Sequence, residues 1–448
     1  MQNHSNTAIR RARIAVVVAA AVLAALLTCI ILVSCLSGTP GIASKDEIIA
    51  NIAAAEEKEG HTVIEYLNDF GISRFNPSRF VSVELNYAMY YYKTELPTDL
   101  VLAKGTASAF LEYFYDNIDL NDKTVVTAAL INCYVYALGD TYGVYRLPAQ
   151  YEDYEGDMSG EFVGIGVEIE YNQLTSELKI SYVMEDSGAK AAGLLAGDFI
   201  THVDGEAVTD IGVDGATNKI RGEAGTTVEV TVLRGTEELT FTVTRSLVVN
   251  KTVRYSVDEN KIAYIQITSF KDNTDELLEE ALDAIKTAGA VGVVFDLRSN
   301  PGGYLDAVLN ALDLLVGRDL VLATYFDRID GKVTIKSATE RALDLPMVVL
   351  CNENTASAGE LFTAAVRDFA KDGVLRATTV GTTTYGKGVM QSTFPFPDGA
   401  ALTMTIAYYN PPCDVNFDGI GVIPEHTEED PEAQLALAYS ELMKLIDN

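Results

Sequence analysis

The feature that most constrains the fold is a regular alternation of short apolar strands and amphipathic helices over residues 252–448. The segments "KIAYIQITSF" and "AVGVVFDLR" are typical of buried strands, and "NTDELLEEALDAIKTAG" between them has helical spacing. The same order recurs when "LPMVVLC" is followed by the alanine-rich "SAGELFTAAVRDFA". Strands that alternate with helices predict βαβ units, and hence a mixed or parallel α/β sheet with helices on its faces.

Two regions of different character precede this part of the chain. Residues 44–150 are predicted to be mainly helical, as in "DKTVVTAALINCYVYALGD". Residues 160–248 instead carry short alternating runs, such as "TVEVTVLRG" and "ELTFTVTRS", separated by glycine-rich turns. The length of 448 residues suits several domains. We therefore expect an α+β / α/β multidomain chain with a compact, mostly-β domain between a helical region and an α/β core.

The N-terminus carries an apolar segment, Ile14–Leu36, of 23 residues without a charge. This length is sufficient to span a bilayer. Three arginines and no acidic residue precede it, so the positive-inside rule places residues 1–13 in the cytoplasm and Ser37 onward outside. The sequence thus predicts a single-pass transmembrane anchor at residues 14–36. Two alternatives stay open: a lipoprotein attached through Cys35 of "LVSC", and a secreted protein whose leader is cleaved.

Composition excludes some functions. The formal net charge is −31, from 64 acidic and 33 basic residues, whereas a nucleic-acid binder needs a basic surface. The five cysteines form no C-x-x-C motif and no cluster with histidines, so we expect no structural zinc site. No metal or organic cofactor is predicted.

Ser357 lies between a predicted strand and a predicted helix, which allows two roles. The sequence "SAGE" fits a capping box, in which the serine side chain bonds a free N–H of the first helical turn. The alternative is a nucleophile, which needs a neighbouring base. Of the four histidines only His426 falls within residues 252–448, and no G-x-S-x-G elbow is present. Lys387, between two glycines in "YGKGVMQ", is the other candidate base.

An acyl-transfer site also needs backbone N–H donors for the developing oxyanion. Ala358 follows Ser357 at a helix start, where N–H groups lack intrahelical partners. Gly302 and Gly303, in "DLRSNPGGYLD", follow another predicted strand. Because sites in open α/β sheets form at the carboxyl ends of strands, these two turns are expected at the same edge.

Several motifs in a fixed order resemble the carboxyl-terminal processing proteases, also called tail-specific proteases. The resemblance covers roughly residues 120–448. It rests on "ALGDTYGVY", "GEFVGIGVEI", "SGAKAAGLLAGDFITHVDGEAV", "IRGEAGTTVEVTVLRG", "IAYIQITSF", "DLRSNPGGYL", "NENTASAGELFTAAVRD" and "GTTTYGKGVMQ". It implies a Ser–Lys serine endopeptidase with a PDZ domain at residues 160–248 inserted before a protease core at residues 252–448.

The resemblance also implies roles for individual residues. Ser357 matches the nucleophile, Lys387 the general base and Gln391 the residue that orients the lysine. The N–H of Ala358 and that of Gly302 or Gly303 match the oxyanion donors. The stretch Phe162, Val163, Gly164, Ile165 and Gly166 matches the PDZ loop that binds the terminal carboxylate of a substrate.

Protein or peptide substrates with free apolar C-termini are the implied partners, and relatives point to a homodimer formed through the N-terminal helices. The family's PDZ domain also gates the active site.

The sequence departs from the family pattern at two places. Thr141 replaces the family's proline, and the stretch "YYNPPCDVNFDGIGVIPEH" differs from the family's motif near the C-terminus. Lys387 and Gln391 would be about 13 Å apart in a fully extended segment at roughly 3.3 Å per residue, so the segment must bend.

Two rival functions remain at this point. One is a catalytically inactive PDZ adaptor that only binds peptides; the joint presence of Ser357, Lys387, Gln391 and the Gly302–Gly303 turn argues against it. The other is a β-lactamase-like Ser–Lys acyltransferase, which would need S-D-N and K-T-G elements that the sequence lacks.

Overall fold

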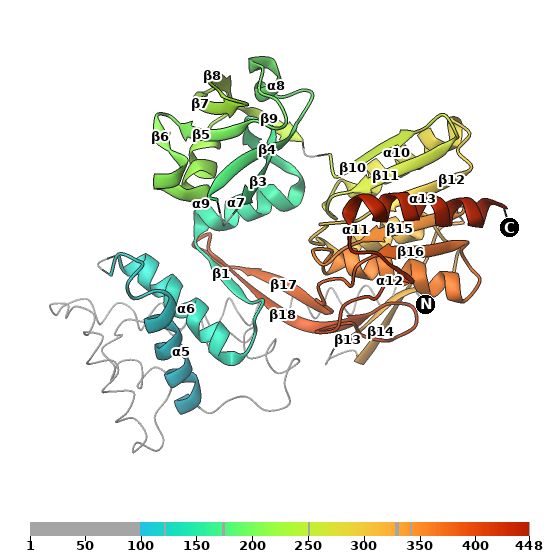
Figure 1. Ribbon diagram of the computed structural model, residues 1–448. Coiled ribbons are helices and arrows are strands. Elements are labelled where there is room, and N and C mark those ends of the chain that lie inside the picture. Colours follow the sequence, from blue (N-terminus) through green and yellow to red (C-terminus); the bar gives the residue numbers. More distant parts are fainter. Residues whose placement is uncertain are drawn as a thin grey trace. The chain divides into compact units, whose positions relative to one another are not determined.

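The computed structural model describes residues 99–120, 122–172, 175–249, 251–327, 331–340 and 343–447 (Figure 1). The predicted anchor at residues 14–36, and the predicted helices before Asp99, lie outside the described residues. No helix within the described ranges is long and apolar enough to cross a membrane. The chain divides into two compact units, and each consists of three separate stretches of sequence.

The first unit comprises residues up to Tyr151, Asp319–Ser337 and Gly386–Gly421. Among its described residues are the helices α5 (Asp99–Tyr113) and α6 (Lys123–Leu138). The Asp122 carboxylate caps α6 by accepting from the Thr124 and Val125 N–H groups, and Gly139 ends the helix in the left-handed conformation.

The sheet of the first unit joins segments far apart in sequence. Its strands are β1 (Val144–Arg146), β13 (Val321–Asp327), β14 (Gly331–Lys336), β17 (Val389–Pro395) and β18 (Ala401–Asn410). The order is β1-β18-β13-β14, and β17 also pairs with β18. Residues 99–150 therefore contain a short strand as well as helices. The strand β1 forms because Val144, Tyr145 and Arg146 pair with residues 401–403 of β18, more than 250 positions away in the chain.

The PDZ part of the second unit follows α7 (Pro148–Ser159). Its elements are β2 (Glu161–Gly164), β3 (Val167–Asn172), β4 (Glu177–Val183), α8 (Gly188–Ala192), β5 (Phe199–Val203), β6 (Glu206–Ala207), α9 (Val208–Ile220), β7 (Thr227–Arg234), β8 (Glu237–Thr244) and β9 (Ser246–Val249). The main sheet has the order β3-β4-β5-β7-β8, and β2 pairs with β9. This confirms the compact, mostly-β character expected for the region. Its core is built from alternate strand residues such as Val228, Val230 and Val232.

The α/β part of the second unit contains the second large sheet. Its strands are β10 (Val253–Val257), β11 (Ile262–Ile267), β12 (Gly292–Asp296), β15 (Met347–Cys351), β16 (Ala377–Gly381) and β19 (His426–Thr427), in this spatial order. The strands from β11 to β19 are parallel, and β10 is antiparallel to β11. Every residue of β12 and β15 is buried, as the continuous apolar runs predict.

Helices cover both faces of this parallel sheet (Figure 1). They are α10 (Thr274–Thr287), α11 (Leu305–Asp313), α12 (Ala358–Lys371) and α13 (Pro431–Asp447). On one face, Ala438 and Leu442 of α13 pack on Val294 and Val348. The neighbouring residue Phe295 points to the opposite face, where its ring lies 5.7 Å from that of Phe362 in α12. The expected mixed α/β core with helices on both faces is confirmed.

Candidate active site

Ser357 occupies a strained turn between β15 and α12. Its φ of 52° and ψ of −117° lie in a region that residues with a side chain rarely adopt. Such strain of about 1–3 kcal/mol persists only where surrounding contacts hold the backbone, and it is commonly found at functional sites. The strand–turn–helix arrangement therefore presents Ser357 at the carboxyl end of a central strand.

A buried glutamate holds this turn. The Ser357 N–H donates to Glu360 Oε2 at 2.8 Å, which is the returning half of the expected capping box. Glu360 is fully buried, and its Oε1 accepts from the hydroxyl of Thr384 at 2.5 Å. Thr384 Oγ1 in turn accepts from the Val422 N–H at 2.7 Å. The carboxylate thus has a partner on each oxygen, and one of them is the backbone of Ser357.

The Asn-Pro-Gly-Gly turn after β12 lies directly against Ser357. A Cβ on Gly302 would be 2.7 Å from Ser357 Cβ and 2.9 Å from the Ala358 nitrogen. A Cβ on Gly303 would be 1.9 Å from the Phe270 carbonyl oxygen. Both glycines also have positive φ, 100° and 145°. Only glycine fits either position, and its absent side chain is what lets the two turns meet.

The backbone N–H groups of Gly303 and Ala358 at this junction are available to a ligand. The Gly302 N–H donates to Asn300 Oδ1 at 2.8 Å and is therefore already engaged. The Phe270 N–H donates to the Gly302 carbonyl and the Tyr304 N–H to the Phe270 carbonyl, a pattern that passes over the Gly303 N–H. Within the described part of the chain, neither the Gly303 nor the Ala358 N–H donates to another protein group. Ala358 is also the first residue of α12, where the helix dipole favours an anion.

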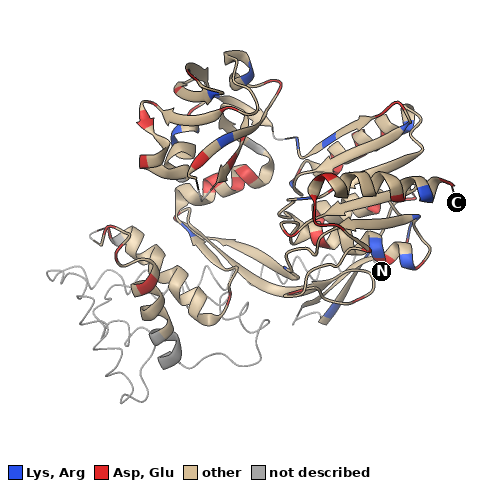
Figure 2. Ribbon diagram, in the orientation of Figure 1, with Lys and Arg blue, Asp and Glu red and all other residues tan. Residues whose placement is uncertain are grey.

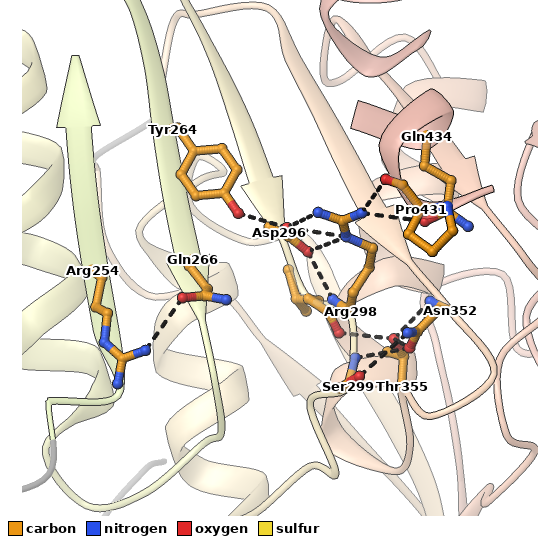
Figure 3. A network of polar contacts seen from close by, with 11 residues as sticks. Arg254, Tyr264, Gln266, Asp296, Arg298, Ser299, Asn352, Thr355, Pro431 and Gln434 are labelled. Carbon is orange, nitrogen blue, oxygen red and sulfur yellow. Dashed lines mark hydrogen bonds and ion pairs between the residues drawn. The ribbon is translucent and has the colours of Figure 1, made fainter. Parts of the chain in front are cut away.

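A polar network fixes the end of β12 (Figure 3). The carboxylate of Asp296 accepts from Arg298 Nη2 at 2.6 Å and from the Tyr264 hydroxyl at 2.6 Å. Arg298 Nη1 also donates to the Pro431 carbonyl at 2.8 Å, at the start of α13. Burial, reinforced by the Asp296 charge, raises the pKa of Tyr264, so its hydroxyl stays protonated and keeps donating.

The same loop is bonded to the turn that precedes Ser357 (Figure 3). The Ser299 N–H donates to Asn352 Oδ1 at 2.8 Å, and Thr355 Oγ1 donates to the Leu297 carbonyl at 2.8 Å. The Ala356 N–H donates to the Asn300 carbonyl at 2.8 Å. These bonds tie the carboxyl ends of β12 and β15 together, as expected for neighbouring parallel strands.

Lys387 and Gln391 meet in the first unit. Lys387 Nζ lies 2.7 Å from Gln391 Oε1, so the segment bends instead of running fully extended. The bend is accompanied by a register shift between Met390 and Gln391 where β17 pairs with β18. A bulge of this kind re-aims side chains.

Tyr142 and Asp140, to which the sequence assigned no individual role, support this pair. Lys387 Nζ also lies 4.7 Å from the centre of the Tyr142 ring, and Gln391 Nε2 donates to the Tyr142 carbonyl at 2.5 Å. The Asp140 carboxylate accepts from the Tyr142 N–H at 3.1 Å and from the Thr405 N–H at 2.8 Å. Both residues belong to the quoted "ALGDTYGVY" motif, which was the signal that could have identified them.

The predicted carboxylate-binding loop lines a cavity of about 190 Å³ in the PDZ part. Phe162, Gly164, Ile165 and Gly166 all line it, together with Thr217 and Ile220 of α9, Arg221 and residues of β3. Val163 does not line the cavity and instead pairs with Leu247 of β9. The strand β3 is an edge of its sheet. An extended peptide could therefore add to this edge beside the cavity.

Comparisons with known proteins agree with this architecture. Residues 261–427 match the sequence model of Peptidase family S41, and residues 163–244 match that of the PDZ domain. The chain is 33% identical over 311 residues to a protein described as a probable CtpA-like serine protease of Staphylococcus haemolyticus, across 69% of this chain and 61% of that one. It is 33% identical over 310 residues to a carboxyl-terminal-processing protease of a Picosynechococcus species, across 68% of this chain and 73% of that one.

A solved structure of a photosystem II D1 C-terminal processing protease is 25% identical, with a TM-score of 0.46, and the match covers 77% of this chain and 93% of that one. The two matched models identify a chain of the Peptidase S41 class with a PDZ domain. The chain belongs to Peptidase family S41. Relatives that it matches are described as CtpA-like or carboxyl-terminal-processing proteases. It spans about three fifths of the length of the staphylococcal relative.

Proposed function

We propose that the protein is a serine endopeptidase of the C-terminal processing type, in which Ser357 is the nucleophile, Lys387 the general base and Gln391 the residue that orients the lysine. The observation that carries the proposal is the strained turn at Ser357, closed by Gly302 at a distance that no other residue allows. The Lys387–Gln391 hydrogen bond of 2.7 Å supports the assigned roles of those two residues.

The reaction proceeds in two half-reactions. In the first, the Ser357 oxygen forms a bond to the scissile carbonyl carbon while its proton passes to the uncharged amine of Lys387. The oxyanion is bound by the N–H groups of Ala358 and Gly303. We favour Gly303 over Gly302 as the second donor, because the Gly302 N–H already donates to Asn300. The C–N bond then breaks, and Lys387 returns the proton to the leaving amine. This leaves an ester on Ser357 and a free Lys387.

The second half-reaction releases the other product. Lys387 takes a proton from water as the water oxygen attacks the ester carbonyl, and the same two N–H groups bind the second oxyanion. The bond to Ser357 breaks, and the serine oxygen recovers the proton. The products are a free carboxylate and a free amine.

Substrate choice is proposed to lie in the PDZ part. The terminal carboxylate of an extended peptide would bind at the loop Phe162–Gly166, and its apolar side chain would enter the adjoining cavity lined by Ile220. The rest of the peptide would add to β3 as a further strand. Such binding would both select free apolar C-termini and gate the catalytic site.

The location is also a proposal. The charge-free segment at residues 14–36, with arginines only before it, supports a single-pass anchor in the cell membrane and an extracytoplasmic enzyme. A homodimer formed through the N-terminal helices is proposed on the family resemblance alone.

Cleavage of an unfolded reporter protein tests the function. The full-length chain is incubated with a reporter that ends in a free apolar C-terminus, and with a copy whose terminal carboxylate is amidated. We expect cleavage of the first reporter, slower cleavage of the second, and none by Ser357→Ala. Equal peptide binding by the wild type and Ser357→Ala, with no cleavage by either, would instead favour the PDZ adaptor.

A further inference from the structure

Lys387 lies in a segment without regular secondary structure, between the end of β16 at Gly381 and the start of β17 at Val389. It is also flanked by two glycines, the most flexible residues a chain can have. A base on such a backbone needs an external support, since a displacement of about 1 Å can cost about 100-fold in rate. The support comes from residues 409–419, the end of β18 and the loop that follows it, which we call the clamp loop.

Two side chains of the clamp loop hold both polar groups of the Gly388 backbone. The Gly388 N–H donates to Asp418 Oδ1 at 3.0 Å, and the Gly388 carbonyl accepts from Asn416 Nδ2 at 2.9 Å. Asn416 is itself fixed, because its Nδ2 also donates to the Tyr409 carbonyl at 2.7 Å and its Oδ1 accepts from the Asp418 N–H at 2.8 Å.

The clamp loop also holds the carbonyl groups of Lys387 itself and of Gly386, the residue before it. The Tyr409 hydroxyl donates to the Lys387 carbonyl at 3.0 Å, and the Gly419 N–H donates to the Gly386 carbonyl at 2.8 Å. Tyr409 is buried, and its ring packs edge-on against Phe417 at 5.6 Å. The peptide around Lys387 therefore has hydrogen bonds on three consecutive residues.

The segment Gly386–Gly388 and the clamp loop are closely packed. A Cβ on Gly388 would lie 2.7 Å from the Asp418 nitrogen and 2.8 Å from Asn416 Oδ1. A Cβ on Gly386 would lie 3.1 Å from the Gly421 nitrogen. Gly388 is thus required by the close approach of the clamp loop, and the φ of 94° at Gly386 favours glycine there.

We propose that Asn416 and Asp418 are positioning residues for the general base: they fix the Gly388 peptide and so determine where the Lys387 amine lies. This inference rests on the proposed role of Lys387 in peptide hydrolysis. It assigns a function to the stretch "CDVNFDG", where the sequence departs from the family's sequence pattern.

A calcium loop is the competing interpretation, because residues 414–425 fit the pattern D-x-[DN]-x-[DN]-G-x5-E. The oxygens of these side chains instead bond to protein groups. Asp414 accepts from Thr324 Oγ1 at 2.7 Å and pairs with Lys332, whereas the Asn416 and Asp418 oxygens accept from backbone N–H groups. No group of three His, Cys, Asp or Glu residues in the described ranges could hold a metal ion.

The decisive comparison uses four variants of the full-length protein. Asp418→Ala removes the acceptor for the Gly388 N–H, and Asn416→Asp replaces the donor to two carbonyls with a negative charge. Both are expected to lower kcat by about 100-fold, with KM changed less than threefold and the rising limb of the pH–rate profile displaced. Asp418→Asn keeps an oxygen acceptor and should restore kcat to within about threefold of the wild type.

Asp414→Asn is the matched control, since Asp414 lies in the same loop but bonds Thr324, Asn410 and Lys332 instead of the lysine segment. It should leave kcat and the pH profile unchanged. An Asn416→Asp or Asp418→Ala variant with wild-type kcat and pH profile would overturn the inference. Loss of wild-type activity in a chelator, restored by calcium, would also overturn it, because the loop would then be a metal site. Cleavage that survives Ser357→Ala would refute the proposed function itself, so the two failures are distinct.

Discussion

Gly302 lies so close to Ser357 that a Cβ on the glycine would be 2.7 Å from the serine Cβ. Real side chains do not approach this closely, so Gly302→Ala must displace the serine turn, the Asn-Pro-Gly-Gly turn, or both. The φ of 100° at Gly302 adds backbone strain for any other residue. We expect Gly302→Ala to lower kcat/KM by at least about 100-fold, because either displacement moves the proposed nucleophile relative to a proposed oxyanion donor.

The matched control is Gly317→Ala. A Cβ at Gly317 would meet nothing within 4 Å, and no left-handed φ is required there. Steady-state cleavage of the same reporter should therefore be unchanged in this variant. Peptide binding by the PDZ part should be unchanged in both variants, so normal turnover by Gly302→Ala would show that the turn is not part of the catalytic site.

Glu360 supports the strained serine by accepting its N–H, and Glu360→Gln tests that support. A glutamine has only one acceptor oxygen, so either the Ser357 N–H or the Thr384 hydroxyl loses its partner in a fully buried site. We expect the variant to lose about 1–3 kcal/mol of unfolding free energy. Its kcat should fall as well, because the serine turn relaxes.

Chemical denaturation and reporter cleavage, measured on the same preparations, check this prediction. Glu280→Gln, an exposed change in α10, is the control and should alter neither quantity. Unchanged stability in Glu360→Gln would mean that the turn is held by other contacts.

The PDZ part depends on an ion pair whose pH dependence can be predicted. The buried Asp198 accepts from Arg234 Nε and Nη2, each at 2.7 Å. Burial raises the pKa of Asp198, but the hydrogen bonds from Arg234 and the Leu195 N–H and the arginine charge together lower it below its usual value. A folded-state pKa below the unfolded value of about 3.9 gives stability that is present above that pH and is lost as the pH falls through the folded pKa.

Arg234→Met should therefore destabilise the PDZ part by about 1.5–3 kcal/mol at neutral pH. The difference from wild type should shrink at acid pH as Asp198 protonates. Hydrogen exchange of the β5 and β7 amides measures this locally in the full chain. Lys190→Met removes an exposed contact with Glu185 and should cost less than about 1 kcal/mol. An Arg234→Met effect that persists undiminished at acid pH would contradict the ion-pair interpretation.

The helices and strands of residues 252–448 were predictable because the residues within each element are enough to indicate its type. Short, β-branched apolar runs such as Val293, Val294 and Phe295 favour buried strands, and the helix start at Ala358 follows from the capping pattern. The strand β1 was missed because Val144 and Tyr145 become a strand only by pairing with β18, and local propensity says nothing about such a distant partner.

The residues of the candidate site could be predicted from local sequence, but their geometry could not. Ser357, Gly302 and Lys387 could be selected by residue type and motif. The strained φ of Ser357 and the clamp on Gly388 could not, because both depend on contacts from segments distant in sequence. The short stretch "CDVNFDG" even suggests a different chemistry, since hydrogen-bonding side chains at alternate positions suit a calcium loop as well as a backbone clamp.

Thiol reactivity should distinguish the three described cysteines. Burial raises the pKa of Cys133 to about 12, and burial, with a smaller contribution from Glu360, raises that of Cys351 to about 12. Both thiols therefore remain protonated and inaccessible near pH 8, whereas Cys413 is exposed. Iodoacetamide followed by peptide mass spectrometry should find Cys413 modified first, with the other two modified only after denaturation. Early labelling of Cys351 would mean that the end of β15 opens in solution.

Removal of the Lys387 amine gives the most direct test of the dyad. Lys387→Met keeps the length of the stem and loses only the nitrogen, so the Gly386–Gly388 backbone and its clamp should be retained. Turnover should fall by at least about 100-fold, because proton transfer by a positioned base contributes roughly 100- to 10,000-fold. In the wild type, kcat/KM should rise with pH through the alkaline range, because only the uncharged amine can accept the serine proton.

Gln391→Ala separates the lysine's orientation from its chemistry. It removes the 2.7 Å hydrogen bond to Lys387 Nζ but leaves the amine in place, so it should lower kcat by less than Lys387→Met does. Lys371→Met, at the end of α12, is the control for loss of a lysine elsewhere and should have wild-type activity. An acid pH optimum, or near-normal turnover by Lys387→Met, would require a different base. His426 would then be the first to replace, because it is the only histidine within residues 252–448.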